Sequence, residues 1–358
     1  MKVGIYTPYL DTTGGGEKYM LTIAEMLSVS HEVYLLLDSH LSLMNIGSIL
    51  KKAEILHNLD LSKIKTEKAP LGKASSFLDR LFYLKKFDYL FYLTDGSLFY
   101  STAKKNVIHF QFPITNISSK GIWGKLKLSS WNLAIFNSKF TQEKIEKNWN
   151  IKGKVVYPPV NVSDFKSLKK KNQIVSVGRF YGYLKDKKQQ LLIDVFKNLV
   201  DEEKIRGWSL HLAGSMGESD KDYVEELKKS AKGYPIFIYP NLPFLDLVRL
   251  YGESKIYWHA LGYGQKEGQK MEHFGITTVE AMASGCVPVV INSGGQKEIV
   301  ENRVNGFLWN DIDELKEFTL ELIEDINLWE KISNASKEKA GEYSKEQFRD
   351  NIFKIVNE

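Results

Sequence analysis

The stretch EHFGITTVEAMASGCVPVV, from Glu272 to Val290, decides the fold of the region around it. Its middle part, TVEAMASG, has the small and apolar residues of a buried helix and ends at Gly285, a common helix terminator. The apolar run CVPVV that follows is typical of a buried strand. Gly275 and the two threonines after it form the expected entry into the helix. The stretch therefore predicts a turn, a helix and a strand in succession, which is one unit of an α/β fold.

The turn before this helix is a predicted anion site. A glycine turn that leads into a helix N-terminus directs free backbone N–H groups and the positive end of the helix dipole at one point. Glu272 precedes the turn and Glu280 lies about one helical turn inside the helix, so a carboxylate flanks the turn on either side. A phosphate at the turn with hydroxyl groups on both sides describes a sugar nucleotide. Gly275, Ile276 and Thr277 are the predicted phosphate-binding residues.

Glu272, seven intervening residues and Glu280 resemble the E-x7-E signature of family 4 of the retaining glycosyltransferases, which have the GT-B fold. The wider run YWHALGYG…EHFGITTVEAMASGCVPVVINSGGQKEIV is similar to the dolichol-pathway α-1,2-mannosyltransferase branch. The resemblance implies two Rossmann-like doubly wound domains that face an interdomain cleft. It also implies that Glu280 binds the ribose and Glu272 the donor sugar, with Phe274 in the donor site. An ordinary αβ unit with surface glutamates is the competing interpretation.

Length and composition are those of a globular chain with two domains. The chain has 358 residues, of which 43% are hydrophobic and 26% charged, enough for two domains of ordinary size. No apolar run approaches the roughly 20 residues that span a bilayer, and we expect MKVGIYTPYL to be a first strand rather than a secretory signal. Cys286 is the only cysteine, which excludes a disulfide framework and favours a reducing compartment such as the cytoplasm. A place at the cytoplasmic membrane face is expected only if the acceptor is lipid-linked. We expect this cysteine to be buried.

Strands and helices alternate along the chain, which predicts parallel doubly wound sheets. Two consecutive prolines, Pro158 and Pro159, and the lysine-rich KSLKKKN mark a connection between domains. From Asp313 onward the pattern is helical, and the resemblance implies that the last helix crosses back to the first domain. The predicted domains are an N-terminal domain of residues 1–165 with about 342–358, and a C-terminal domain of residues 166–341. By resemblance, the acceptor enters from the first of these domains and the second binds the nucleotide sugar. The strands expected from the pattern, besides CVPVV, are KVGIYTPYL, HEVYLLL, AEIL, DYLFYLTDG, KNVIHFQFP, a short strand at the start of LAIFNSKF, QIVSVGRF, WSLHLAGS, IFIYPN and IYWHAL.

The first predicted strand is followed by a glycine loop, where Gly14, Gly15 and Gly16 would let the backbone approach a ligand closely. The spacing is not GxGxxG, so it does not predict a dinucleotide site. By resemblance, this loop lines the cleft near the transferred sugar and diphosphate, and a histidine in the position of His109 faces the donor sugar. His109 ends a predicted strand, where open α/β sheets bind ligands. A simple turn and a structural histidine are the competing interpretations.

The segment VGRFYGYLKDKKQ places Arg179 at a strand end and Lys187 just before a helix. The leaving nucleoside diphosphate gains negative charge, which fixed donors stabilise by about 3–4 kcal/mol each in comparable oxyanion sites. By resemblance, Arg179 and Lys187 correspond to the family's diphosphate-binding pair, and Lys188 is the alternative to Lys187. Together with His109 and Glu272, this pair completes the predicted catalytic set.

Two Asp-x-Asp triplets, at 220–222 and 311–313, are candidate metal sites, because metal-dependent transferases hold Mg²⁺ or Mn²⁺ with such pairs. Both triplets have the pattern of helix starts, where aspartate caps backbone N–H groups. His259 and His273 flank the predicted site without the spacing of metal ligands. Since the arginine–lysine pair already supplies positive charge, we expect no metal and no cofactor.

Positive charge is concentrated in the first half of the chain. Residues 1–160 hold 21 Lys and Arg against 13 Asp and Glu, a net charge of +8, and the remainder holds 28 against 31, a net charge of −3. A basic half indicates an acidic or phosphate-bearing partner, although plain solvation by lysines is an equal alternative. In SSKGIWGKLKLSSW, Ser118 to Trp131, lysines and tryptophans alternate with aliphatic residues, a pattern of membrane interfaces and also of a helix packed on its own domain.

The predicted function is retaining transfer of a hexose from a nucleotide sugar to a glycan acceptor. Mannose, GDP-mannose as donor, a lipid-linked acceptor and same-face displacement without a covalent nucleophile are implied by the resemblance alone. The alternatives are a UDP-sugar-dependent transferase that builds a surface polysaccharide, an epimerase or phosphorylase of the same fold, and a binding protein without turnover. We expect base recognition near Tyr239 to Leu242 and no nucleic-acid partner.

Overall fold

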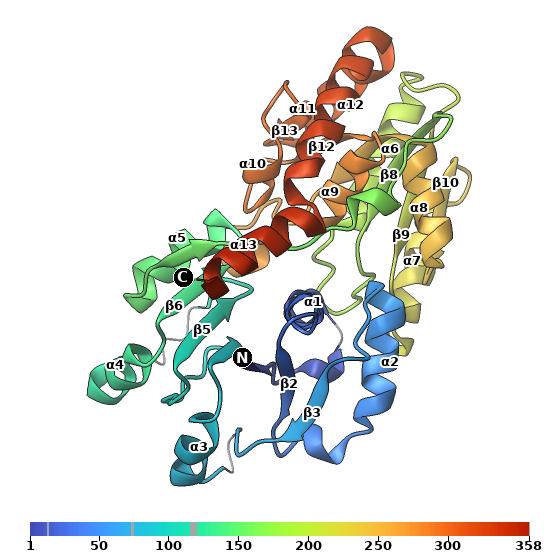
Figure 1. Cartoon of the computed structure of the whole chain (residues 1–358). Helices are drawn as coiled ribbons and strands as arrows, with labels where there is room; N and C mark the ends of the chain where they lie inside the picture. The colour runs from blue at the N-terminus through green and yellow to red at the C-terminus, as the bar shows by residue number, and fades with distance from the viewer. Residues whose placement is uncertain (13, 73–74, 115–119, 358) are drawn as a thin grey trace. The chain divides into compact units, whose positions relative to one another are not determined.

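The computed structural model describes residues 1–12, 14–72, 75–114 and 120–357. Contacts divide the chain into two compact units, Met1–Pro159 with Phe348–Glu358, and Val160–Gln347 (Figure 1). The domain boundaries predicted from the sequence lie near residues 165 and 342. The boundaries between the two contact-defined units lie at 159/160 and 347/348. Within the described residues, no helix is both long and apolar enough to cross a bilayer.

The first unit is built on a parallel sheet whose described strands follow the order β3-β2-β1-β4-β5-β6-β7. Its strands alternate buried side chains between two faces, as the pleat requires, and both faces carry apolar clusters. Burial on both faces explains why the central strands β1 and β4 are almost continuous apolar runs in the sequence. The strands are β1 (Lys2–Tyr6), β2 (Glu32–Leu37), β3 (Lys65–Lys68), β4 (Tyr89–Leu93), β5 (Lys105–Phe110), β6 (Leu133–Phe136) and β7 (Gly153–Val155).

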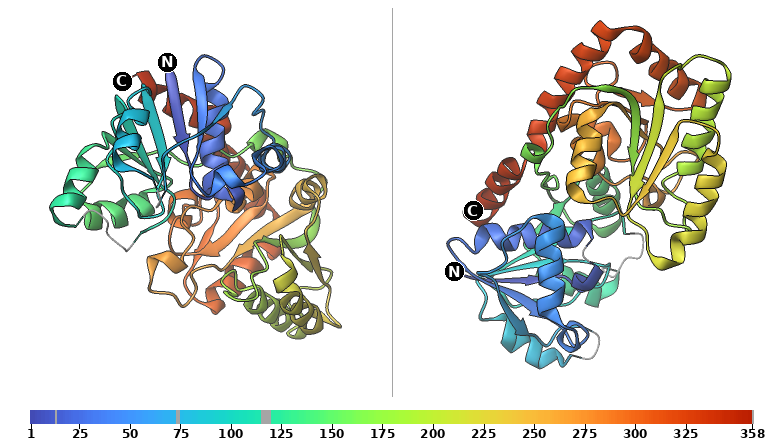
Figure 2. Two further views of the ribbon diagram at one scale, coloured as in Figure 1. Left: turned by 90° about the horizontal axis from the view of Figure 1, so that it is seen from below. Right: turned by 90° about the vertical axis from the view of Figure 1, so that its right-hand side faces the viewer.

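Helices cover both faces of this sheet (Figures 1 and 2). The helix that ends the chain packs with α1 on one face: the Phe348 and Tyr19 rings meet edge to face at 4.8 Å, and the Tyr89 hydroxyl donates to the Val356 carbonyl at 2.8 Å. The C-terminal residues therefore belong to the core of the first unit. Its helices are α1 (Gly15–Leu27), α2 (Ile46–His57), α3 (Phe77–Leu84), α4 (Gly121–Ser129), α5 (Lys139–Trp149) and α13 (Lys345–Asn357), which begins in the second unit.

One predicted strand of the first unit is wrong. The run AEIL lies inside α2, whose N-cap Asn45 accepts a hydrogen bond from the Ser48 backbone N–H and whose C-cap Asn58 is left-handed. Ala53 packs with Ile46, Ile49 and Leu50 against the apolar cluster on the sheet, a spacing of one helix face. Four apolar letters read alone cannot separate a buried strand from a helix segment.

The second unit repeats the architecture with the strand order β10-β9-β8-β11-β12-β13 among its described residues, all pairs parallel. The fold class is therefore confirmed as α/β, with two Rossmann-like doubly wound sheets. The strands are β8 (Lys171–Val177), β9 (Ser209–Gly214), β10 (Ile236–Pro240), β11 (Ser254–His259), β12 (Val287–Ile291) and β13 (Phe307–Trp309). The helices are α6 (Gln189–Asp201), α7 (Lys221–Ala231), α8 (Phe244–Glu253), α9 (Ile276–Ala283), α10 (Gln296–Ile299), α11 (Ile312–Glu324) and α12 (Ile326–Ala340).

The opening stretch of the sequence forms the elements predicted for it. TVEAMASG supplies most of α9, Gly285 has a positive φ of 76° at the helix end, and CVPVV leads into β12. Cys286 is fully buried, as expected, with its thiol 3.1 Å from the Tyr251 carbonyl oxygen and 3.2 Å from that of Ser254.

Candidate active site

The order of strands in the second unit marks where a ligand would bind. β8 and β11 are neighbours, but the chain leaves β8 toward β9 and leaves β11 toward β12, on the opposite side. Such a reversal creates a crevice outside the carboxyl ends of the two strands, the usual ligand site of open α/β sheets. Arg179 follows β8, and His259 is the last residue of β11. The predicted diphosphate ligand Arg179 and one of the two histidines expected to flank the site are thus both at this switch point.

A cluster of three polar side chains, two of them charged, lies at the switch point. The Lys187 Nζ donates to the Glu272 Oε2 at 2.9 Å, and the His259 Nε2 is 3.1 Å from the same oxygen. The side chains of Lys187 and Glu272 are 24% and 18% exposed, and that of His259 is 3% exposed. The structure thus pairs the predicted diphosphate cation with the predicted sugar-binding carboxylate.

The electrostatics of this cluster keep Glu272 ionised. Burial alone would raise the pKa of Glu272, but the Lys187 charge and the His259 hydrogen bond outweigh it and hold the pKa well below its usual range. Burial lowers the pKa of His259, against the opposing effect of Glu272. A carboxylate in this state is a pure hydrogen-bond acceptor, suited to hydroxyl groups of a ligand.

Gly275 is the turn that separates Glu272 from α9. Its φ of 122° and ψ of 55° are strained for any other residue, and a Cβ there would lie 2.9 Å from the Gln296 Nε2. Thr278 and Val279 donate their backbone N–H groups to the Gly275 carbonyl oxygen at 3.0 and 3.2 Å. Helix geometry leaves the N–H groups that precede them for an external acceptor, and a glycine N-cap has no side chain to compete. The predicted phosphate-binding turn has the backbone geometry that the prediction requires.

A second glycine segment, NSGGQ at residues 292–296, supports this turn. The Gly295 N–H donates to the Glu272 carbonyl oxygen at 2.7 Å. A Cβ at Gly294, whose φ is 59°, would lie 2.1 Å from the same oxygen. The Thr278 hydroxyl donates to the buried Gln296 Oε1 at 3.0 Å. The NSGGQ run therefore fixes the backbone on both sides of Gly275. Its two consecutive glycines are the feature of the sequence that could have indicated this close approach.

A buried glutamine, Gln189, holds the backbone of the loop after β8; the sequence pattern did not indicate this role. The Gln189 Nε2 donates to the Arg179 carbonyl oxygen at 3.0 Å, and the Tyr223 hydroxyl donates to the Gln189 Oε1 at 3.1 Å. The Arg179 guanidinium is exposed and donates to the Tyr181 hydroxyl at 2.6 Å. Lys188, the alternative cation, is the N-cap of α6 with a positive φ of 58°. Gln189 thereby anchors the backbone that carries the predicted diphosphate ligand.

The remaining predicted residues of the second unit occupy two environments. The Tyr251 hydroxyl is 3.3 Å from both the Thr277 carbonyl oxygen and the Glu280 Oε2. This tyrosine of α8 therefore links the turn to Glu280, the residue predicted to bind the ribose. Ile276 is half-buried. The Phe274 ring is buried edge to face against Tyr343 at 5.3 Å, so Phe274 would reach a donor only through its backbone.

The predicted residues of the first unit gather around Gln111. The His109 Nε2 is 2.8 Å from the Gln111 Oε1, and the His109 ring stacks on Tyr19 of α1 at 3.9 Å. A Cβ at Gly16 would lie 3.4 Å from the Gln111 Cγ, and one at Gly15 would lie 3.8 Å from its Nε2. His109 is fully buried, and burial lowers its pKa to about 4, so it is neutral at pH 7. The glycine loop and the histidine are thus neighbours, and their contact with a donor sugar stays a prediction.

The family model for glycosyl transferases group 1 matches residues 161–339, half of the chain. The chain belongs to this family. The match contains the whole of the Lys187–Glu272 cluster and the Gly275 turn described above. As a group 1 glycosyltransferase with two doubly wound sheets, the chain has the GT-B fold.

Curated relatives of this group 1 glycosyltransferase include two named GDP-Man:Man(3)GlcNAc(2)-PP-Dol alpha-1,2-mannosyltransferase. That of Dictyostelium discoideum is 28% identical over 222 residues, which cover 56% of this chain and 41% of the relative. That of Xenopus laevis is 30% identical over 201 residues, which cover 51% and 39%. The chain thus spans about two fifths of the length of these relatives. Among solved structures, HepE of Anabaena in complex with UDP has a TM-score of 0.75 at 18% identity, with all of both chains covered.

The Asp-x-Asp triplets of this glycosyltransferase are helix starts, as predicted. Asp220 accepts the backbone N–H groups of Gly182 at 3.0 Å and Gly217 at 2.9 Å, one on each carboxylate oxygen. Asp311 is the N-cap of α11 and accepts the Glu314 N–H at 2.9 Å. Among the residues that the structure describes, no group of three or more His, Cys, Asp and Glu is placed to hold a metal ion.

The segment expected to read the base is firmly held. The Tyr239 hydroxyl is 3.2 Å from the Nδ1 of His211, and burial, together with Lys171, lowers the pKa of His211 to about 4. The Asn241 side chain closes the loop by accepting the Met216 N–H at 2.9 Å. Its role toward a nucleotide remains a prediction.

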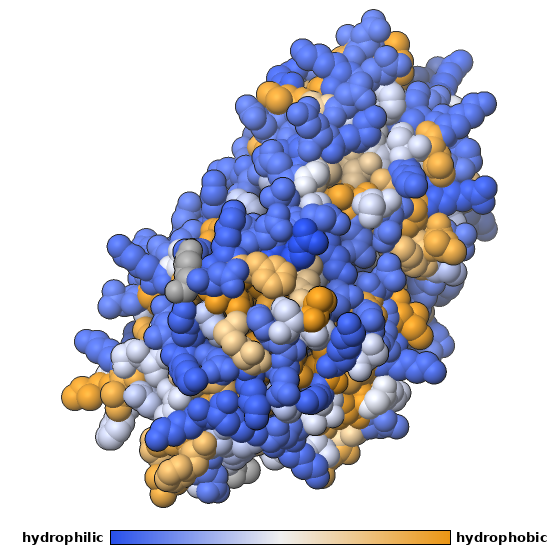
Figure 3. All heavy atoms as spheres, in the orientation of Figure 1, coloured by the Kyte–Doolittle hydropathy of each residue, from blue (hydrophilic) through white to orange (hydrophobic). Residues whose placement is uncertain are grey.

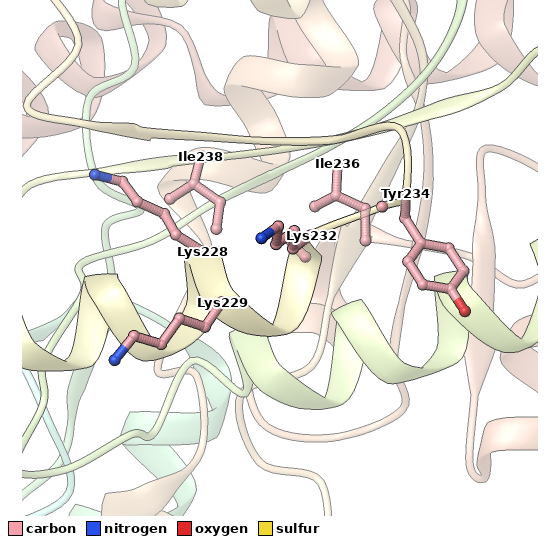
Figure 4. A pocket seen from close by; sticks show the side chains of 8 residues that line it. Lys228, Lys229, Lys232, Tyr234, Ile236 and Ile238 are labelled. Carbon is pink, nitrogen blue, oxygen red and sulfur yellow. The ribbon is translucent and has the colours of Figure 1, made fainter.

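A shallow depression of about 370 Å³ lies elsewhere on the second unit of the glycosyltransferase (Figure 4). It is lined by lysines from the end of α7 and by Ile236 at the start of β10, so it lies away from the carboxyl ends of the strands. Lys228 is paired with Glu225 at 2.8 Å, and the amino groups of Lys228 and Lys229 point apart in Figure 4. The depression therefore offers no convergent charge.

Proposed function

We propose that this chain is a retaining, family 4-like hexosyltransferase that transfers mannose from a nucleotide sugar to a glycan acceptor. The observation that carries the proposal is the Gly275 turn, which puts a helix N-terminus directly after the Lys187–Glu272 pair at the switch point of a group 1 glycosyltransferase. The turn and the cation suit a diphosphate. The ionised carboxylate suits the hydroxyl groups of the sugar, and Glu280 those of the ribose.

The transfer proceeds by same-face displacement at the anomeric carbon. An acceptor hydroxyl oxygen forms the new bond as the bond to the diphosphate oxygen breaks, and the electron pair of that bond leaves with the nucleoside diphosphate. The acceptor's proton passes to a phosphate oxygen, so no covalent enzyme nucleophile is needed. Arg179, Lys187 and the N–H groups of α9 stabilise the charge that develops on the leaving group.

The proposed donor is GDP-mannose, the nucleotide sugar in the printed names of the curated relatives. The test supplies the full chain with radiolabelled GDP-mannose, UDP-glucose or UDP-N-acetylglucosamine and measures release of the sugar and its transfer to a lipid-linked Man₃GlcNAc₂ diphosphate. We expect GDP-mannose to be used and the α-configuration to be retained. If only a UDP-sugar were turned over, that sugar nucleotide would be the donor in place of GDP-mannose. If the product were an isomerised free sugar nucleotide, the enzyme would be an epimerase.

Removal of metal ions should leave activity unchanged. The positive charges of Arg179 and Lys187 take the place of a divalent cation, since protein cations and backbone N–H groups can stabilise a developing anion. Initial rates in excess EDTA should equal those with added Mg²⁺ or Mn²⁺. Loss in EDTA with recovery on adding either ion would contradict the prediction and redirect attention to Asp222 and Asp313.

The proposed acceptor is lipid-linked, and an anionic bilayer is the proposed partner of the first unit. α4 exposes Ile122 and Trp123, at 84% and 75%, and the preceding α3 exposes Phe77 and Phe82. Figure 3 shows hydrophobic residues in orange at its lower left, over α3 and α4. Between Asp95 and Glu143, a stretch that contains α4, the sequence has no acidic residue and six lysines, and this positive charge complements negative headgroups. Ser118 and Ser119 lie outside the described residues.

The variant Trp123→Ala/Lys125→Ala/Lys127→Ala should bind anionic liposomes less than wild type does. Each lysine near such a surface contributes about 1 kcal/mol, and tryptophan adds apolar insertion. Sedimentation with anionic and with neutral vesicles measures the difference, which should shrink as salt screens the charges. The matched control, Lys229→Ala/Lys232→Ala, removes the same charge from the second unit and should sediment like wild type. Equal sedimentation of all three proteins would exclude α4 as a membrane contact.

A further inference from the structure

One strand of the second unit contacts the Gly275 turn on both of its sides. Tyr257 and His259 lie two residues apart on β11, so their side chains share one face of the sheet, and their rings are 6.4 Å apart. The His259 Nε2 is 3.1 Å from the Glu272 Oε2, ahead of the turn. The Tyr257 hydroxyl is 2.8 Å from the Thr277 Oγ1, after the turn. β11 therefore holds both flanks of the turn, and Tyr257 is its contact on the helix side.

The hydrogen bond between Tyr257 and Thr277 has a preferred direction. Tyr257 is fully buried, and burial raises the pKa of its phenol, an effect that the Thr277 hydrogen bond only partly offsets. A phenol is a stronger acid than an aliphatic alcohol and is the better hydrogen-bond donor of the two. Tyr257 therefore donates to the Thr277 oxygen, which leaves the hydrogen of the Thr277 hydroxyl for another acceptor. Thr277 is half-buried rather than enclosed, so that acceptor can belong to a ligand.

The first turn of α9 is held through groups other than its backbone N–H donors. At α11 and α12 of the same unit, an aspartate N-cap accepts backbone N–H groups. α9 begins after Gly275, which has no side chain for this purpose. Instead, the Tyr251 hydroxyl is 3.3 Å from the Thr277 carbonyl oxygen, and the Thr278 hydroxyl donates to Gln296 at 3.0 Å. These contacts fix the helix start and leave its N–H groups for an anion.

A buried donor without a partner lies against the same turn. The Gln296 side chain is fully buried, and its Nε2 has no hydrogen-bond partner among the residues that the structure describes. This nitrogen is 2.9 Å from the position that a Cβ on Gly275 would occupy. A buried, unsatisfied donor is costly, and a ligand oxygen at the turn would satisfy it. The Gln296 amide thus points independently to a ligand with acceptor oxygens at this place.

We propose that Tyr257 is a positioning residue, which orients the Thr277 hydroxyl so that it donates to the diphosphate of the sugar nucleotide. The inference rests on the proposed transferase function and adds a side-chain donor to the N–H groups of α9. Negative charge grows on the diphosphate as its bond to the sugar breaks, so a hydroxyl that is held in the right direction stabilises the transition state without first having to rotate. Tyr257 acts through Thr277 and touches no reacting atom.

The test combines substitutions at both ends of this hydrogen bond in the full chain, with GDP and UDP as probes in calorimetry. Thr277→Val should raise the Kd of the diphosphate that wild type binds by at least about fivefold, since it removes a hydrogen bond to a charged group. Tyr257→Phe should raise it about threefold, because the hydroxyl remains but is no longer oriented. In the Thr277→Val background, Tyr257→Phe should change nothing further, whereas in Thr277→Ser, which keeps the hydroxyl, its effect should persist. In steady-state kinetics Tyr257→Phe should lower kcat and leave the acceptor KM unchanged.

The matched control is Tyr89→Phe. The Tyr89 hydroxyl is buried in the first unit and donates to the Val356 carbonyl oxygen at 2.8 Å, so this substitution removes a tyrosine hydrogen bond of the same length from the other unit. The control should melt earlier but bind the diphosphate like wild type, and melting temperatures identify any variant that fails to fold. An unchanged Kd in Tyr257→Phe, or an equal loss with and without the Thr277 hydroxyl, would overturn the positioning role while the donor site stands. If wild type bound neither GDP nor UDP, the proposed function would fail, and the positioning role with it.

Discussion

Lys187→Ala should lower turnover more than tenfold. The substitution removes a charge-assisted hydrogen bond to a desolvated group, a loss greater than about 1.5 kcal/mol, and the proposed leaving diphosphate loses a cation. It also leaves Glu272 without the partner that stands 2.9 Å away, so the pKa of Glu272 should rise, because the Lys187 charge is a main cause of its low value. Steady-state kinetics with GDP-mannose measures the effect.

Neighbouring positions provide the controls for this prediction. Arg179→Ala should also cost more than about tenfold, by the same loss of a phosphate contact, whereas Lys188→Ala should be milder. If Lys187→Ala had wild-type kinetics and Lys188→Ala were impaired, Lys188 and not Lys187 would be the lysine that binds the diphosphate. In a Glu272→Gln background, Lys187→Ala should still reduce turnover, because the lysine is proposed to contact the diphosphate as well as the carboxylate. If Lys187→Ala caused no further loss of turnover in that background, the role of Lys187 would be only to orient Glu272.

The local elements around the donor turn could be predicted because several levels of the sequence agree there. Small residues, a terminating Gly285 and an apolar run all point to helix and then strand, and α9 and β12 follow. α2 was missed because the hydrophobic periodicity between its caps, Asn45 and Asn58, is weak. Which of its faces is buried becomes clear only from the sheet on which it packs. α3 was not predicted either, and its apolar side chains are not all directed at the core, since Phe77 and Phe82 are exposed.

Contacts between distant segments could not be predicted. The E-x7-E spacing indicated two carboxylates around a turn, but the partner of Glu272 is 85 residues away in sequence. Gln189 resembles any polar residue at the start of a helix, and only the fold brings its amide to the Arg179 carbonyl oxygen. In the same way, the burial of His109 beneath Tyr19 depends on where α1 packs on the sheet. Pairing across a sheet is a tertiary property that one sequence does not encode locally.

Gly275→Ala should sharply reduce both donor binding and stability. A residue with a Cβ at φ 122° and ψ 55° is strained, typically by about 1–3 kcal/mol. The new methyl group would also lie 2.9 Å from the Gln296 Nε2 and 3.1 Å from the Ile299 Cδ1. Gln296 is fully buried and holds the Thr278 hydroxyl, so it cannot swing into solvent to make room. The N-terminus of α9 must move instead, and a displacement of about 1 Å in a catalytic arrangement can cost roughly 100-fold in rate.

Gly207→Ala separates backbone strain from this displacement. Gly207 has a positive φ of 74° in the same unit, and a Cβ there meets nothing within 4 Å. Both variants should melt earlier, by about 2–4 °C for each kcal/mol in a unit of this size, with Gly275→Ala the lower of the two. Only Gly275→Ala should raise the KM for GDP-mannose and reduce kcat at temperatures where both variants are folded. If Gly275→Ala lost stability but kept wild-type kinetics, the start of α9 would not be the phosphate-binding turn, because moving that backbone must alter every N–H group aimed at the diphosphate.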